Sequence, residues 1–99
     1  MGKASLPDRL DARLALADRD VRLAQQMADL LREMGFQIED ISPRGVRFAG
    51  TGDLFESVFH SRIRATGSGF TFEAAPQLPD ALAEAGASVY LPTRPEYFP

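Results

Sequence analysis

The 99-residue sequence predicts an α+β fold with an antiparallel sheet, and three observations lead to that prediction. Segments in which apolar and polar residues alternate are typical of half-buried strands, and they stand between segments with the three-and-four spacing of amphipathic helices. The longest helical segment ends at a glycine, and a turn sequence separates two neighbouring strand segments. A chain of this length has room for one domain. We expect that domain at residues 10–91, with an N-terminal extension at 1–9 and an extended tail at 92–99.

The first third of the chain predicts a strand followed by a helix. Over residues 10–16 the apolar residues at positions 10, 12, 14 and 16 alternate with Asp11, Arg13 and Ala15, which indicates a strand with one buried face. Asp18 and Asp20 then offer side-chain oxygens as an N-cap for a helix over residues 21–34. Gly35 ends this helix, because glycine adopts the left-handed conformation without strain.

A hairpin and a second helix are expected next. Residues 36–39 and 46–49 alternate on either side of the turn 42–45, SPRG, in which proline fixes one dihedral angle and glycine accepts a positive one. Thr51 or Asp53 then caps a short helix that carries four apolar residues through Phe59.

The rest of the chain predicts a strand over residues 61–65, a hairpin arm at 70–73, a brief helix over 80–85 and an extended segment at 88–91. The order β-α-β-β-α-β matches the ferredoxin-like arrangement, in which two helices cover one face of a four-stranded antiparallel sheet and leave the other face free. We interpret the free face as the binding surface. Alternation places six side chains on it: Arg13, Gln37, Glu39, Arg47, Arg62 and Arg64.

Composition narrows the function classes. A net charge of -3 and a pI near 5.0 argue against nucleic-acid binding, which requires an excess of basic residues. The sequence contains no cysteine and one histidine, so we expect neither a metal site nor a cofactor. No nucleophile or acid–base constellation accompanies the carboxylates, which favours a binding module over an enzyme.

No apolar run is long enough for a membrane span, and the first 17 residues lack the apolar core of a signal peptide. We therefore expect no membrane partner. The protein is expected to be cytoplasmic if the sequence is full length, and to belong to a secreted precursor if it is an excised domain.

Five segments in a fixed order span about residues 12–95. They are LLREMGF at 30–36, VRFAGT at 46–51, FESVF at 55–59, PQLPDAL at 76–82 and YLPTRP at 90–95. In this order and spacing the chain resembles the activation pro-domain of the sedolisin (kumamolisin-like) family of subtilisin-related serine peptidases. Two positions depart from the family pattern, because His60 stands where the family usually has glycine and residues 91–92, Leu-Pro, replace a glycine-containing approach to the arginine-proline pair.

The resemblance implies a propeptide that acts as an intramolecular chaperone and a protease inhibitor. The open sheet face would dock on the peptidase through Arg13, Arg47, Arg62 and Arg64. The tail would run through the active-site cleft, with Arg94, Pro95, Glu96, Tyr97 and Phe98 as its contact residues. No catalytic residue is carried over.

Alternatives remain beside this interpretation. The four sheet-face arginines are also consistent with ordinary solvated charge, since exposed ion pairs contribute about 0 to 1 kcal/mol. A stand-alone protein–protein interaction or assembly module, including one that associates with itself, would keep the fold without a peptidase. A nucleic-acid binder is less favoured, because the open side of the central strands lacks aromatic residues for base stacking.

Overall fold

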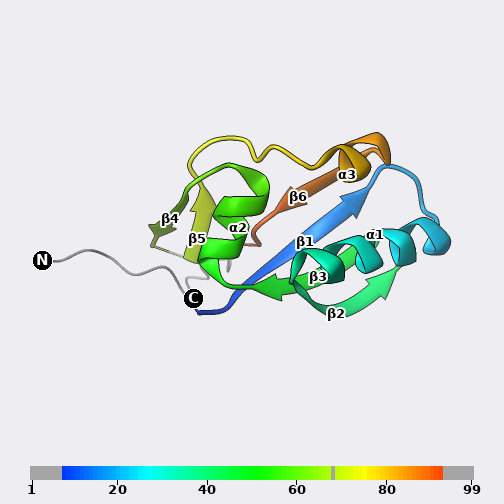
Figure 1. Ribbon diagram of the computed structural model, residues 1–99, viewed down its shortest axis with the longest axis horizontal. Coiled ribbons are helices and arrows are strands. Elements are labelled where there is room, and N and C mark those ends of the chain that lie inside the picture. The colour runs from blue at the N-terminus through cyan, green and yellow to red at the C-terminus, as the bar shows by residue number, and fades with distance from the viewer. Residues whose placement is uncertain (1–7, 68, 93–99) are drawn as a thin grey trace, which may run out of the picture.

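The computed structural model describes residues 8–67 and 69–92, and it has an α+β fold (Figure 1). Four strands form an antiparallel sheet in the order β2-β3-β1-β6: β1 (Leu10–Leu16), β2 (Gln37–Ser42), β3 (Gly45–Gly50) and β6 (Ala87–Tyr90). A separate two-stranded sheet contains β4 (Ile63–Thr66) and β5 (Gly69–Phe72). The helices are α1 (Val21–Met34), α2 (Gly52–Phe59) and α3 (Asp80–Glu84).

Helix α1 begins and ends as the sequence predicts. The Asp20 carboxylate accepts hydrogen bonds from the backbone amides of Arg22 at 2.9 Å and Leu23 at 3.3 Å, which are unpaired within the helix. Gly35 follows with a φ of 111°. Its amide donates to the Arg32 carbonyl, so the last turn of the helix is closed by backbone hydrogen bonds.

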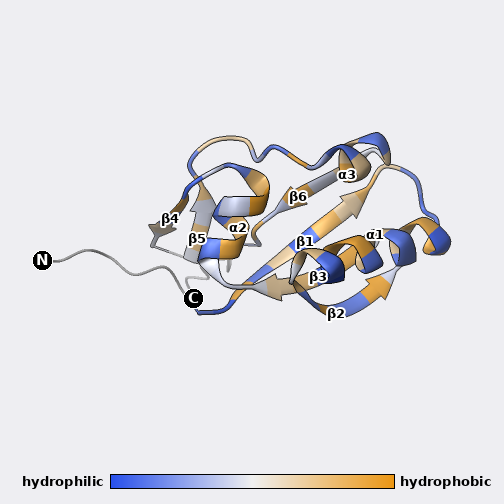
Figure 2. Ribbon diagram, viewed as in Figure 1, coloured by the Kyte–Doolittle hydropathy of each residue, from blue (hydrophilic) through white to orange (hydrophobic). Residues whose placement is uncertain are grey.

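The core lies between the helices and one face of the sheet. Four phenylalanine rings occupy its centre, with neighbouring ring centroids 4.9 to 6.4 Å apart: Phe36, Phe48, Phe55 and Phe59. Figure 2 shows orange and blue alternating along β1 and α1, as expected of elements with one buried side. Figure 1 places α1 and α2 on the same side of the sheet, and no helix of the described residues covers the opposite sheet face.

Strand β3 sits between β2 and β1 and begins at a residue without a side chain. Gly45 opposes Ala15 of β1 and has a φ of +156°. A Cβ atom there would lie 1.8 Å from the carbonyl oxygen of Leu14. The β2–β3 turn is also joined to the β1–α1 connection, because the Leu16 amide donates to the Arg44 carbonyl and the Asp20 amide donates to the Pro43 carbonyl.

The expected fourth strand of the sheet was placed wrongly. Residues 61–65 were expected to join the main sheet, whereas β4 pairs only with β5, and β6 takes the edge position beside β1. Each of the two strands buries one residue in the same core, Ile63 in β4 and Val89 in β6, so the alternation pattern does not distinguish which of them pairs with β1. The Ile63 amide also donates to the Glu56 carboxylate at 2.7 Å, which holds β4 against α2.

Candidate functional site

The face of the four-stranded sheet opposite the helices carries a row of polar side chains, one from each strand. Tyr90 of β6 pairs with Arg13 of β1, Arg13 pairs with Arg47 of β3, and Arg47 pairs with Asp40 of β2. Directly opposed residues on one face lie about 4.5–5.5 Å apart at Cβ, so the two guanidinium groups share one region of space. Like charges in this arrangement repel, and the pairing is imposed by the strand register.

A bulge in β2 decides which acid faces this row. The register shifts between Ile38 and Asp40, which brings Asp40 rather than Glu39 opposite Arg47. Glu39 instead accepts a hydrogen bond from Arg9, and this bond raises the pKa of the Arg9 guanidinium. Simple alternation from Ile38 would put Glu39 opposite Arg47, and the bulge gives that position to Asp40.

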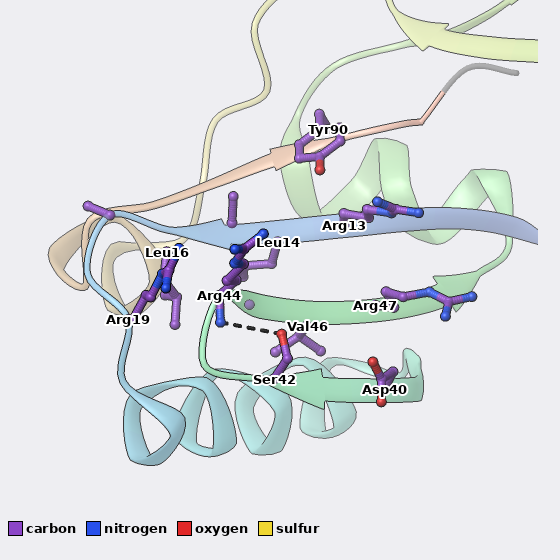
Figure 3. Close-up of a pocket in the computed structure, with 13 residues that line it drawn as sticks. Arg13, Leu14, Leu16, Arg19, Asp40, Ser42, Arg44, Val46, Arg47 and Tyr90 are labelled. Carbon is purple, nitrogen blue, oxygen red and sulfur yellow. Dashed lines mark hydrogen bonds between the residues drawn. The ribbon is translucent and has the colours of Figure 1, made fainter. Parts of the chain in front are cut away.

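One end of this face is hollowed, with a volume of about 500 Å³ (Figure 3). The side chains around it include four arginines and three other polar residues: Arg13, Arg19, Arg44, Arg47, Asp40, Ser42 and Tyr90. We call this feature the arginine hollow. In Figure 3, Arg13 and Arg47 extend in the same direction from adjacent strands, and Arg19 and Arg44 lie together near the β2–β3 turn.

Backbone hydrogen bonds fix the two arginines at the turn. Arg44 is held through its carbonyl, which accepts from Leu16 at 2.9 Å, and through its amide, which donates to the Ser42 hydroxyl at 3.3 Å. Arg19 precedes Asp20, whose amide is 3.0 Å from the Pro43 carbonyl. The two loops are thereby joined, and their side chains reach the same end of the sheet.

The four arginines of the hollow take no part in the ion pairs recorded for residues 8–67 and 69–92. Those ion pairs join Arg9 to Asp11 and Glu39, and Arg32 to Asp29. A guanidinium group has five donors in a planar fork that matches a carboxylate or phosphate. Tyr90 as a residue is 46% exposed, and its side chain adds a flat apolar surface with a hydroxyl group. The arrangement is therefore suited to binding an anionic group at the protein surface.

Two further observations concern the acidic residues and the single histidine in the described part of the chain. No cluster of three or more His, Asp or Glu side chains there is placed to hold a metal ion. His60 lies at the C-cap of α2 in a left-handed conformation, with a φ of 52°. His60 therefore stands at the C-terminal end of α2, next to the last backbone carbonyl groups of the helix.

The structure separates the predicted sheet-face arginines into two sets. Arg13 and Arg47 lie side by side on the open face, as expected. Arg62 precedes β4 and Arg64 belongs to β4, so both are on the separate hairpin, and their placement on the main sheet was wrong. The predicted tail contacts at 94–98 lie outside the described residues, as do residues 1–7 of the predicted N-terminal extension.

Sequence reasoning missed Arg19, Arg44 and Tyr90 as members of the site. Arg19 and Arg44 are in connections, where no periodicity marks the side-chain direction. Tyr90 had a usable signal, because Ser88 and Tyr90 alternate with the more buried Ala87 and Val89. That pattern predicts that the tyrosine shares the polar face of its strand.

Comparisons of the chain with protein-family models, with curated proteins and with solved structures found no match. Among the described residues, no helix has both the length and the apolar character needed to cross a bilayer.

Proposed function

We propose that this chain is a protein-binding module that docks a subtilisin-like serine peptidase through the open face of its four-stranded sheet, as a folding chaperone, an inhibitor or both. The observation that carries the docking proposal is the row of Tyr90, Arg13 and Arg47 on the open face, in which neither arginine forms an ion pair with an acid among residues 8–67 and 69–92. Exposed tyrosine and arginine are the residue types enriched at the centres of protein interfaces. The choice of a peptidase as the partner rests on the resemblance to the sedolisin pro-domain.

We also propose that the architecture is a ferredoxin-like arrangement with a hairpin inserted before its last strand. The support is the antiparallel order β2-β3-β1-β6, in which β3 separates the strands on either side of α1. The insert is β4–β5. A local observation agrees with the resemblance: His60 adopts a left-handed conformation, which a glycine at this position would also favour.

In this proposal the residues after β6 enter the active-site cleft of the peptidase. Tyr97 and Phe98 serve as apolar anchors, and the prolines of the tail reduce the entropy lost when it is held extended.

A second candidate is an interaction or assembly module without a peptidase partner. The observation that favours it is the position of Arg62 and Arg64 on the separate hairpin. The open face consequently has two of the four arginines that the resemblance implies for docking.

The test is inhibition of a purified sedolisin-family peptidase, followed with a chromogenic peptide substrate. The intact chain is expected to slow hydrolysis, and the double variant Arg13→Gln plus Arg47→Gln is expected to relieve the inhibition. This variant removes a like-charge pair, so its free energy of unfolding should not fall. The matched control, Arg22→Gln plus Arg32→Gln, removes the same charge from the exposed side of α1 and should inhibit like the original chain.

A chain ending at Pro92 separates the contribution of the tail. Loss of inhibition with retained binding would support the cleft role of residues 94–98. If the intact chain neither binds nor inhibits the peptidase, the peptidase proposal is wrong. If the two double variants lose binding equally, the open face is not the docking surface.

A further inference from the structure

The geometry points to the chemistry of the segment that occupies the arginine hollow. We propose that the hollow binds an extended acidic peptide segment of the partner, with two carboxylates on the same side, two residues apart. This inference rests on the proposed function in one respect, namely that the open face binds a protein.

The charge of the hollow is the first argument. Four arginines surround it against one aspartate, Asp40, although the whole chain has a net charge of -3. The positive charge is therefore local and opposite in sign to the rest of the protein. An acidic ligand is attracted to this region and repelled by the remaining surface, which favours one binding orientation.

The spacing of the arginines is the second argument. Arg13 and Arg47 form one cluster, and Arg44 lies three residues before Arg47 on the same strand and turn. Three residues of extended chain span about 10 Å at 3.3 Å per residue, and flexible arginine side chains shorten or lengthen that separation. In an extended peptide, side chains on the same side recur every two residues, or about 6.8 Å. The remaining difference of about 3 Å is within the reach of flexible arginine side chains. One carboxylate can therefore reach Arg13 and Arg47, and the other can reach the second cluster, Arg19 and Arg44.

The surface between the clusters is the third argument. Ala15 of β1 opposes Gly45 of β3 there, so no long side chain fills the space between the two clusters. Tyr90 lies beside Arg13 and gives the peptide backbone a flat wall. A single phosphate ion would engage one cluster and leave the other without a partner. Two separate carboxylates on one segment satisfy both.

The experiment uses the intact ¹⁵N-labelled chain and two blocked pentapeptides of identical composition, followed by NMR chemical shifts. In Ser-Glu-Thr-Glu-Ser the carboxylates share one side of an extended chain, and in Ser-Glu-Glu-Thr-Ser they point to opposite sides. We expect the first peptide to bind several-fold more tightly, with shifts at Ala15, Gly45 and Arg47. Arg44→Gln should weaken binding about two- to fivefold, as for loss of an exposed ion pair, and Arg22→Gln should leave it unchanged.

Three outcomes would overturn the inference: equal binding of the two peptides, shifts that map to another surface, or tighter binding of inorganic phosphate than of either peptide. Dimerisation of the chain that blocks the hollow, measured by sedimentation, would also overturn it. The proposed function fails separately. In one outcome the peptide fails to bind while Arg13→Gln plus Arg47→Gln abolishes inhibition of the peptidase. That result would support docking through the open face and contradict the proposed acidic segment in the hollow. If the peptide binds and no peptidase is inhibited, the acidic ligand of the hollow is supported and the proposal of a peptidase partner is contradicted.

Discussion

Replacing Gly45 with alanine tests whether the close contact between β1 and β3 governs the stability of the sheet. The new Cβ atom would lie 1.8 Å from the carbonyl oxygen and 2.9 Å from the carbonyl carbon of Leu14. Both obstacles are backbone atoms, so rotation of a side chain cannot relieve the overlap. The first strand and the β2–β3 turn must move apart.

The expected loss follows from two contributions. A non-glycine residue with the Gly45 φ of +156° costs about 1 to 3 kcal/mol. Separation of the strands weakens one or two backbone hydrogen bonds, each with a net contribution of about 0.5 to 1.5 kcal/mol. We therefore expect Gly45→Ala to lower the free energy of unfolding by about 2 to 5 kcal/mol. For a domain of this size the Tm should fall by at least about 8 °C.

Urea denaturation followed by circular dichroism measures this change, with Gly67→Ala as the matched control. A Cβ atom at Gly67 would meet nothing within 4 Å, so alanine there should be neutral or stabilise the protein by up to about 1 kcal/mol. A Gly45→Ala variant within about 0.5 kcal/mol of the original chain would refute the reasoning, because ordinary surface substitutions have effects of that size.

Two further substitutions test single hydrogen-bonding side chains. Asp20→Ala removes the acceptor for the Arg22 and Leu23 amides and should lower the free energy of unfolding, measured by urea denaturation, by about 1 kcal/mol. Asp18→Ala removes no such bond and should be nearly neutral. Equal losses in the two variants would contradict the capping assignment. Ser61→Ala leaves the backbone of Ala74 without the bonds of 2.8 and 3.3 Å that the hydroxyl group makes, and the Tm should fall by an amount equivalent to about 1 to 3 kcal/mol. The exposed Ser57 is its control, and a Ser57→Ala variant that loses as much stability would show that the Ser61 bonds are unimportant.

Local signals in the sequence were sufficient to predict those helix ends and strand faces that depend only on neighbouring residues. Helix α1 has its cap at Asp20 and its terminating glycine at Gly35, and both are readable without tertiary context. The alternation of β1 and β3 likewise placed Arg13 and Arg47 on one face. These predictions are confirmed because a period of two residues fixes the side on which each side chain lies.

Local signals in the sequence did not predict which strands pair or where the side chains of the connections lie. The alternation around Arg64 is consistent with any half-buried strand, and it does not say that β4 pairs with β5 instead of β1. The bulge near Glu39 reverses the facing of the residues after it, which strict alternation does not include. The signal in QIEDIS is the three-residue spacing of Ile38 and Ile41, which both oppose core residues of β3. Arg19 and Arg44 reach the hollow because two connections are hydrogen-bonded to each other, a contact that depends on the folded chain.

The bulge in β2 also affects whether a strand of another molecule can pair with this edge of the sheet. Strand β2 is an edge of the sheet, and an exposed straight edge is a template for the strand of another molecule, which leads to aggregation. The bulge and the acidic pair at Glu39 and Asp40 interrupt that template with misaligned hydrogen-bonding groups and negative charge. Edge-to-edge growth of the sheet is thereby opposed at β2, and the protein can present an open arginine-bearing face without this edge recruiting further chains into a fibre.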